Sequence, residues 1–184
     1  CKLLVDEAHA LGILGNKGKG LSHPFLDSIS MVSGTFGKAF GSGGAFLATN
    51  KKTGEMLIQT SNPFRYTTAL SPSLAAGALK SLQKIKKNQN LGTNLLKISK
   101  KWKEEIENIG KYEVIGDAHI LSLIIGDEEK TMMMQNFLEE KGFLAVGIRP
   151  PTVPLGKSRI RLTIRNSFNT DILKNFISVL KAYK

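Results

Sequence analysis

A carboxylate, an imidazole and an amine lie near the start of the chain where they could act together. Asp6 and His9 follow the apolar run Leu3–Val5, and Lys38 lies in the glycine-rich stretch Ser33–Gly44. A carboxylate at the end of a buried strand can keep a heterocyclic nitrogen protonated, because charges are less screened in a partly desolvated crevice. A lysine between glycines can approach an aldehyde closely, since glycine has no Cβ to clash. These residues are the parts needed to hold an aldehyde cofactor such as pyridoxal phosphate.

Each of these residues also has an ordinary interpretation. An Asp and a His after a strand can be a cap and a surface imidazole, and Lys38 can be a solvated side chain on a mobile loop. The run Asp6–His9 also spells the Asp-Glu-Ala-His box of nucleic-acid helicases, in which carboxylates hold magnesium beside a nucleotide. Val32 and Ala39 stand where a phosphate-binding loop needs a glycine and a magnesium-binding hydroxyl. The nucleotide-hydrolysing interpretation is therefore a remote alternative.

The composition excludes several other classes of protein. The 184 residues, 41% of them hydrophobic, suit one globular domain or two small ones. The net charge of +11 is spread over short groups of lysines and aromatic residues are few, so we expect no nucleic-acid partner. The single cysteine, Cys1, excludes an internal disulfide and a Cys-rich zinc site. Since no cysteine or histidine stands at ligand spacing from His23 or His119 in the sequence, we expect no metal. Without a long apolar run or a secretion signal, we expect no membrane partner and a cytoplasmic location.

Apolar spacing predicts an α/β organisation. Three short, uniformly apolar runs are typical of strands buried on both faces of a parallel sheet, where ligands bind at the carboxyl ends. Helical spacing begins at Pro72, and a second helix is predicted over 93–108. The predicted strands are 3–5, 31–33, 45–48, 120–125, 143–148 and 159–164, and two further helices cover 129–141 and 170–183. Because the chain opens inside a predicted strand without Met, we expect that a larger N-terminal part is absent.

Several spaced motifs carry a resemblance to a known family. They are Val5–Gly12, Gly15–Gly20, Thr35–Gly41 with Gly43–Ala45, Tyr66–Pro72, Arg149–Pro154 and Arg159–Thr163. Together they resemble the α-oxoamine synthases, fold-type I pyridoxal phosphate enzymes that condense an amino acid with an acyl thioester and release CO2. The resemblance implies that residues 1–86 are the C-terminal part of a large cofactor-binding domain with a mostly parallel sheet. Residues 87–184 would then be a smaller α/β C-terminal domain.

The motif Arg149–Pro154 separates members within this family. It resembles the biotin-pathway member, which joins L-alanine to a pimeloyl thioester and forms 8-amino-7-oxononanoate, CO2 and free thiol. Members that use glycine and make 2-amino-3-ketobutyrate or 5-aminolevulinate carry a Tyr-Pro pair before Val-Pro, and they remain an alternative. A degenerate subunit that only supports a catalytic partner is a third possibility, against which the presence of both Lys38 and Asp6 argues.

The resemblance also implies a role for each site residue. Lys38 forms the Schiff base and later moves a proton, Asp6 pairs with the pyridine nitrogen, and His9 contacts the phenolic oxygen. Thr35 contacts the phosphate. Thr67 or Thr68 reaches the phosphate of the neighbouring subunit's cofactor, which implies a homodimer with shared active sites.

The C-terminal motifs would bind substrate. The resemblance makes Arg161 the two-pronged donor to the amino acid carboxylate, a geometry that guanidinium provides. Thr152 and Arg149 are expected to contact substrate. If the family resemblance is set aside, Arg159 and Arg161 could be solvated arginines on one face of a strand. Since the family's N-terminal half supplies a ring-stacking residue and much of the acyl pocket, we expect the 184 residues alone to be inactive and to bind pyridoxal phosphate weakly.

Overall fold

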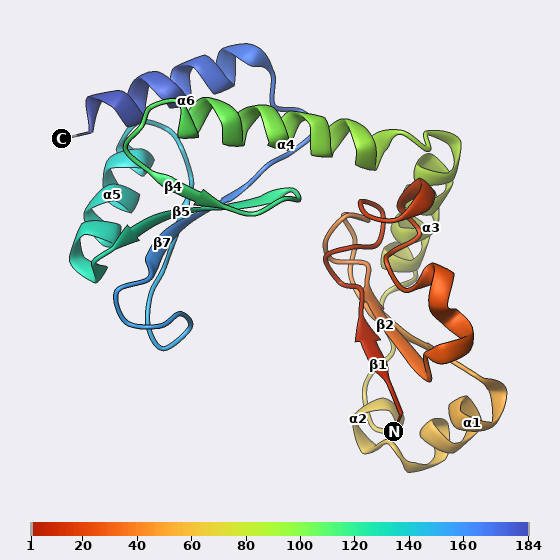
Figure 1. The fold of residues 1–184 in the computed structure, drawn as a ribbon. Coiled ribbons are helices and arrows are strands. Elements are labelled where there is room, and N and C mark those ends of the chain that lie inside the picture. Colours follow the sequence, from red (N-terminus) through yellow and green to blue (C-terminus); the bar gives the residue numbers. More distant parts are fainter. Residues whose placement is uncertain (1, 184) are drawn as a thin grey trace. The chain divides into compact units, whose positions relative to one another are not determined.

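Residues 2–183 are described by a computed structural model and form two compact units that divide between Thr93 and Asn94 (Figure 1). Cys1, on which the expectations about disulfides and zinc depend, lies outside the described residues, as does Lys184. The assignment of residues 1–86 and 87–184 to a large and a small domain stays a prediction.

A three-stranded sheet in the order β1-β2-β3 forms the centre of the first unit. β1 (Leu4–Asp6) and β2 (Met31–Thr35) are parallel, whereas β3 (Ala45–Thr49) is antiparallel to β2. The connection Phe36–Gly44 is shorter than the crossover of about a dozen residues that a parallel strand needs, so the chain turns back as a hairpin. The prediction of a mostly parallel sheet is therefore confirmed only for β1 and β2.

The strands of this sheet are also less buried than we expected. Leu4 on β1 is 50% exposed and Leu47 on β3 is 42% exposed. Within residues 2–183, no strand pairs with the second edge of β1. A uniformly apolar run indicates that a strand is suited to burial on both faces. It does not establish that other segments of these residues cover both faces.

The α-helices of the first unit come after its three strands in the sequence. α3 (Pro72–Lys87) begins as predicted with Pro72 in its first turn. α1 (Lys51–Thr60) and α2 (Asn62–Arg65) were not predicted. Two short 3-10 helices, Asn16–Gly18 and His23–Ser28, lie between β1 and β2.

The second unit is built on a four-stranded sheet in the order β4-β5-β7-β6, in which every neighbouring pair is antiparallel. β4 was not predicted, and the predicted strand 143–148 is strand only over its last three residues. The strands are β4 (Glu113–Ile115), β5 (Ile120–Gly126), β6 (Val146–Ile148) and β7 (Ser158–Thr163).

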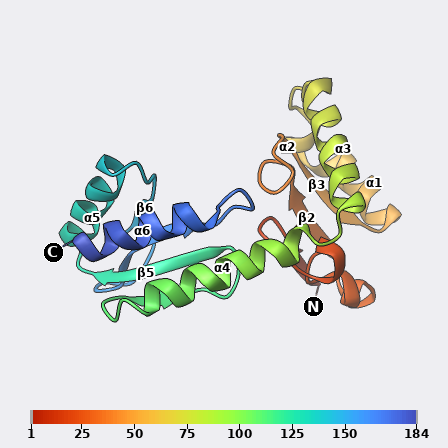
Figure 2. The same ribbon diagram turned by 90° about the horizontal axis from the view of Figure 1, so that it is seen from above.

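The core of the second unit lies between this sheet and its helices. α4 (Leu91–Glu107) and α6 (Thr170–Ala182) lie side by side in Figure 2, and the rings of Trp102 and Phe176 are 5.1 Å apart. α5 (Glu128–Glu140) contacts β5, β6 and β7. Other buried side chains of this core include Ile106, Leu121, Leu123, Met134, Leu138, Ile160, Leu162, Ile164, Leu173 and Leu180.

Candidate functional site

β1 ends at Asp6, and the chain turns at the carboxyl edge of the sheet. The Asp6 Oδ1 atom accepts the N–H of Ala8 at 2.8 Å. The N–H of Glu7 donates to the carbonyl oxygen of Ser33 at 2.9 Å, which ties this turn to β2. The side chains of Asp6 and His9 are both exposed. The carboxylate and the imidazole are therefore both presented at the end of β1.

Lys38 lies in a hydrogen-bonded turn between β2 and β3. Its carbonyl oxygen accepts the N–H of Gly41 at 3.0 Å, and Gly41 has a φ of +59°, which favours glycine. Ser42 N–H donates to Phe36 O at 2.8 Å, and Phe36 N–H donates to Gly44 O at 2.9 Å. The Lys38 side chain is exposed. The turn therefore holds the backbone while leaving the amine accessible.

Helix α3 anchors this turn from outside. Ser42 Oγ donates to the carbonyl oxygen of Leu74 at 2.6 Å, and Ser81 Oγ donates to the carbonyl oxygen of Phe40 at 2.6 Å. The Phe40 side chain is buried, with its ring 5.5 Å from that of Phe36. These contacts argue against the interpretation of Lys38 as a residue on a loosely held loop.

Thr35, the expected phosphate contact, stabilises the same turn. Its hydroxyl lies 3.1 Å from the carbonyl oxygen of Gly44, to which it donates, and accepts the N–H of Gly37 at 3.1 Å. Since the hydroxyl proton is directed to a carbonyl, Thr35 would have to rotate or offer backbone N–H groups to bind an anion. Its phosphate contact stays a prediction.

The ends of β1 and β2 bring four of the expected residues to one edge of the sheet. Because the two strands are parallel and Asp6 lies opposite Ser33, the segments that follow them leave from the same edge. Asp6 and His9 lie on one of these segments, and Thr35 and Lys38 lie at the end of β2 and just beyond it. A carboxylate, an imidazole and an accessible amine at one edge fit pyridoxal phosphate.

The remaining expected residues lie elsewhere in the two units. Thr67 and Thr68 are exposed in the loop between α2 and α3. Arg149 and Thr152 are exposed in a turn of the second unit that is closed by Thr152 N–H and the Arg149 carbonyl oxygen at 3.0 Å. The contacts expected of these residues stay predictions.

Arg161 lies on β7 in the second unit and is partly exposed. Strand alternation places Arg159 on the same face, opposite the buried Ile160. Arg161 also lines a cavity of about 760 Å³ together with aromatic residues such as Trp102 and Phe143. A guanidinium beside an apolar cavity could bind an anion whose other end is apolar.

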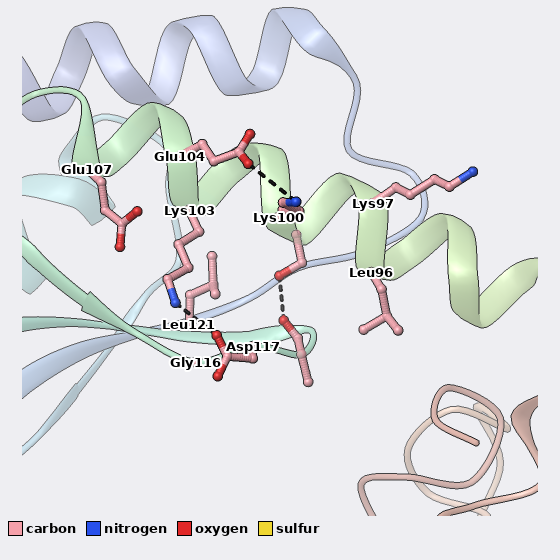
Figure 3. A pocket seen from close by; sticks show the side chains of 11 residues that line it. Leu96, Lys97, Lys100, Lys103, Glu104, Glu107, Gly116, Asp117 and Leu121 are labelled. Atoms are coloured by element: carbon pink, nitrogen blue, oxygen red, sulfur yellow. Dashed lines mark hydrogen bonds and ion pairs between the residues drawn. The ribbon is translucent and has the colours of Figure 1, made fainter.

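A second cavity, of about 480 Å³, lies between α4 and the turn from β4 to β5, and no sequence pattern predicted it (Figure 3). Lys103 Nζ lies 2.9 Å from Asp117 Oδ1, and Ser99 Oγ donates to Ala118 O. The hydrogen bond that Lys103 donates to Asp117 raises the pKa of Lys103 above its ordinary value of 10.5, although partial desolvation opposes the shift. Because Glu104 and Glu107 accompany the lysines here, the cavity has no strong preference for one sign of charge.

The raised pKa of Lys103 predicts how pH affects stability. A group whose pKa is higher in the folded state stabilises the fold fully below its ordinary value of 10.5 and loses that effect as pH rises through the folded value. Asp117→Asn is therefore expected to lower the stability by less than about 1 kcal/mol near pH 7, and by progressively less above about pH 10.5. Urea unfolding at pH 7 and pH 11 measures both values. The more distant and exposed Lys100–Glu104 pair, at 3.9 Å, is the control, and Glu104→Gln should have a smaller effect at pH 7.

The sequence did not assign a role to Glu7, although it stands between Asp6 and His9. Its side chain is only 2% exposed, and its carboxylate accepts the N–H of Ser22. A signal was available, because neighbouring residues at the end of a strand point to opposite faces. If Asp6 faces solvent, Glu7 faces the interior.

Comparisons with known proteins identify a family model and relatives that match this chain. Residues 1–180 match the family model described as aminotransferase class I and II. The chain is 36% identical over 165 residues to 8-amino-7-oxononanoate synthase of Pseudomonas putida, covering 88% of this chain and 42% of that protein. The chain therefore spans less than half the length of this curated relative.

Solved structures show the same likeness. Serine palmitoyltransferase of Sphingomonas wittichii matches with a TM-score of 0.91 and 25% identity, covering 98% of this chain and 46% of that one. For 8-amino-7-oxononanoate synthase of Francisella tularensis the TM-score is 0.84 at 25% identity, covering 98% of this chain and 54% of that one. The α/β fold is therefore shared with these enzymes over almost all of the chain. Among residues 2–183, no helix is long and apolar enough to cross a membrane.

Proposed function

The chain belongs to the aminotransferase class I and II family, and on that premise we propose that it takes part in the condensation of L-alanine with a pimeloyl thioester. The products would be 8-amino-7-oxononanoate, CO2 and free thiol. The observation that carries the proposal is the 36% identity to an 8-amino-7-oxononanoate synthase over 165 residues. The family match also covers Asp6–His9, and it argues against the helicase-like interpretation of these residues.

Pyridoxal phosphate is the cofactor of solved relatives in this family. Bound at the edge formed by β1 and β2, it would supply an electron sink for the carbon that loses a proton. Lys38 would hold the aldehyde carbon and, once released, move the proton at the substrate α-carbon. Asp6 would keep the ring nitrogen protonated, and His9 would donate to the phenolic oxygen. Asp6 matters most where negative charge develops in the transition state.

The substrate side of the proposal rests on residues of the second unit. Arg161 would bind the amino acid carboxylate with two parallel N–H donors. Thr152 and Arg149 would contact substrate beside it. Thr67 or Thr68 would reach the cofactor phosphate of a second copy, so the proposed active form is a homodimer with shared sites.

The role of Arg161 gives a prediction for substrate affinity. Arg161→Lys keeps the positive charge but loses the paired donors, so the KM for L-alanine should rise about 10- to 100-fold while the KM for the thioester changes less than about threefold. Steady-state kinetics with each substrate varied in turn measure the two values. Arg159→Lys is the matched control, because Arg159 lies on the same strand face but donates to Lys157 O at 3.0 Å. An equal rise in both KM values would count against the assignment.

The proposed reaction is tested by supplying the natural polypeptide that contains this sequence with pyridoxal phosphate, an amino acid and an acyl thioester. L-Alanine, glycine and L-serine are each combined with pimeloyl and palmitoyl thioesters, and the products are identified by mass spectrometry. We expect L-alanine and the pimeloyl thioester to give the largest kcat/KM. A larger value for glycine would support the alternative members of the family, and a larger value for L-serine with the palmitoyl thioester would indicate a serine palmitoyltransferase activity. Either result would overturn the proposed substrates.

A further inference from the structure

Glu7 is a buried acid that the proposed mechanism does not use. Its side chain is 2% exposed, whereas the neighbouring Asp6 side chain is exposed. A buried carboxylate is costly unless it is hydrogen-bonded. The Glu7 Oε1 atom accepts the N–H of Ser22, which is itself buried and lies fifteen positions further along the chain. A carboxylate at the end of β1 therefore holds a distant part of the backbone.

Gly20 shows how closely that backbone approaches Glu7. A Cβ atom added at Gly20 would lie 2.8 Å from Glu7 Cδ and 2.9 and 3.0 Å from its two carboxylate oxygens. Gly20 also has a φ of +90°, which L side chains rarely adopt. Only glycine leaves room for the carboxylate at this position.

The segment 12–22 is a closed unit that transmits this contact. Gly12 N–H donates to Gly18 O at 2.8 Å, and Gly20 N–H donates to Leu14 O at 3.0 Å. A segment held in place at Gly20 is therefore also held at Gly12, through the hydrogen bond between Gly12 and Gly18.

Gly12 in turn lies against the residue that follows Lys38. A Cβ added at Gly12 would lie 3.0 Å from Ala39 Cβ. The preceding Leu11 packs on β2, because a Cβ at Gly34 would lie 2.6 Å from Leu11 Cδ1. Leu11 therefore touches β2, and the segment that follows it touches the turn beyond β2. Contacts therefore run from the Glu7 carboxylate to the side chain of Ala39, the residue that follows Lys38.

From these contacts we infer that Glu7 is a positioning residue that clamps the segment 12–22 and thereby sets the Asp6–His9 turn against the turn that carries Lys38. The backbone of Glu7 strengthens the clamp, since its N–H donates to Ser33 O and its carbonyl oxygen accepts the N–H groups of Ala10 and Leu11. The inference rests on the proposed function only in the roles of Asp6 and Lys38, and the clamp itself is a property of the fold. A misplacement of about 1 Å at reacting groups can cost about 10²-fold in rate.

The first test needs no cofactor and follows backbone amide hydrogen exchange in the 184-residue chain. Glu7→Ala removes the acceptor, and Gly20→Ala inserts a methyl group against the carboxylate. In both variants we expect exchange at Ser22, Gly12 and Gly41 to accelerate at least about 10-fold. Glu7→Gln keeps an oxygen acceptor in the same volume and should restore most of the protection.

Two controls separate the clamp from general damage. Gly142→Ala changes a glycine with a φ of +85° that has nothing within 4 Å of an added Cβ, so it matches the backbone strain of Gly20→Ala without the contact. Leu138→Ala removes a fully buried side chain from the second unit and destabilises without touching the clamp. Neither control should accelerate exchange at Gly12 or Gly41 below its unfolding temperature. If Glu7→Ala accelerates only Ser22 and leaves Gly12 and Gly41 unchanged, the inference is overturned.

The second test uses the natural polypeptide with pyridoxal phosphate and borohydride, and it measures the yield of label on Lys38 by peptide mass spectrometry. We expect Glu7→Ala to lower this yield at least about 10-fold at equal folded fraction. Glu7→Gln should give a yield close to that of the wild type, and Leu138→Ala should leave the yield unchanged. A Glu7→Ala yield within about twofold of wild type would overturn the positioning role. If the wild type itself carries no label on Lys38, the proposed function fails, and the exchange measurements alone decide on the clamp.

Discussion

Lys38→Ala is expected to lower product formation by the natural polypeptide more than about 10³-fold, because one residue would both hold the cofactor and move a proton. The fold should be unaffected, since the Lys38 side chain is exposed and its turn is held by backbone hydrogen bonds and by the contacts of Ser42 and Ser81 with other main-chain atoms. Lys38→Arg should be equally inactive, because a guanidinium remains protonated and cannot attack an aldehyde. Product formation and circular dichroism measured on the same samples test both statements.

Lys51→Ala is the control for a general effect of losing a lysine. Lys51 is an exposed residue of α1 whose described partner is Glu55 at 3.9 Å, so its loss should change the rate less than about twofold. Lys38→Ala activity above one tenth of the wild-type value would contradict the role of Lys38.

Asp6→Asn is expected to lower kcat about 10²- to 10³-fold while changing the affinity for pyridoxal phosphate less than about 10-fold. The substitution removes the charge but keeps an oxygen that can accept the N–H of Ala8, which Asp6 Oδ1 accepts at 2.8 Å. The turn should therefore persist, and the effect should appear where charge develops at the substrate carbon. Loss of the α-hydrogen of L-alanine in deuterium oxide, followed by NMR, measures that step directly.

Cofactor affinity is measured in parallel by fluorescence titration. Asp27→Asn, which removes an exposed carboxylate of the same unit, should leave both quantities unchanged. Equal losses in α-hydrogen exchange and in cofactor affinity would mean that Asp6 holds the cofactor rather than stabilising developing charge.

Much of the fold followed from apolar spacing. The long helices α3, α4, α5 and α6 and the strand β7 were predicted closely, because their buried faces recur over several turns or alternate along the strand. The prediction that β3 runs parallel to β2 was wrong. The length of the connection Phe36–Gly44 was a signal against it, because a parallel crossover needs more residues. α1 was missed because it buries no side chain, and its clearest signal is the cap in which Asn50 accepts the N–H of Thr53.

The candidate site was predictable where it depends on sheet topology. Asp6 and the segment of Lys38 follow parallel strands, so their shared edge could be inferred from the apolar runs before them. Strand alternation could have indicated that Glu7 points inward, but its partner Ser22 could not be inferred, because Ser22 is distant in sequence and is brought near by glycines with positive φ. Thr67, Thr68 and Thr152 lie in exposed irregular segments, where no periodicity indicates what they contact.

The central claim is that the Lys38 amine binds the aldehyde of pyridoxal phosphate at the edge where Asp6 is presented. Its most direct test is reduction of the natural polypeptide with borohydride in the presence of pyridoxal phosphate, followed by peptide mass spectrometry across all lysines. We predict one reduced pyridoxyl group per chain, on Lys38, and its loss when L-alanine is added before reduction. Label on a different lysine, in a preparation that forms 8-amino-7-oxononanoate, would contradict the account.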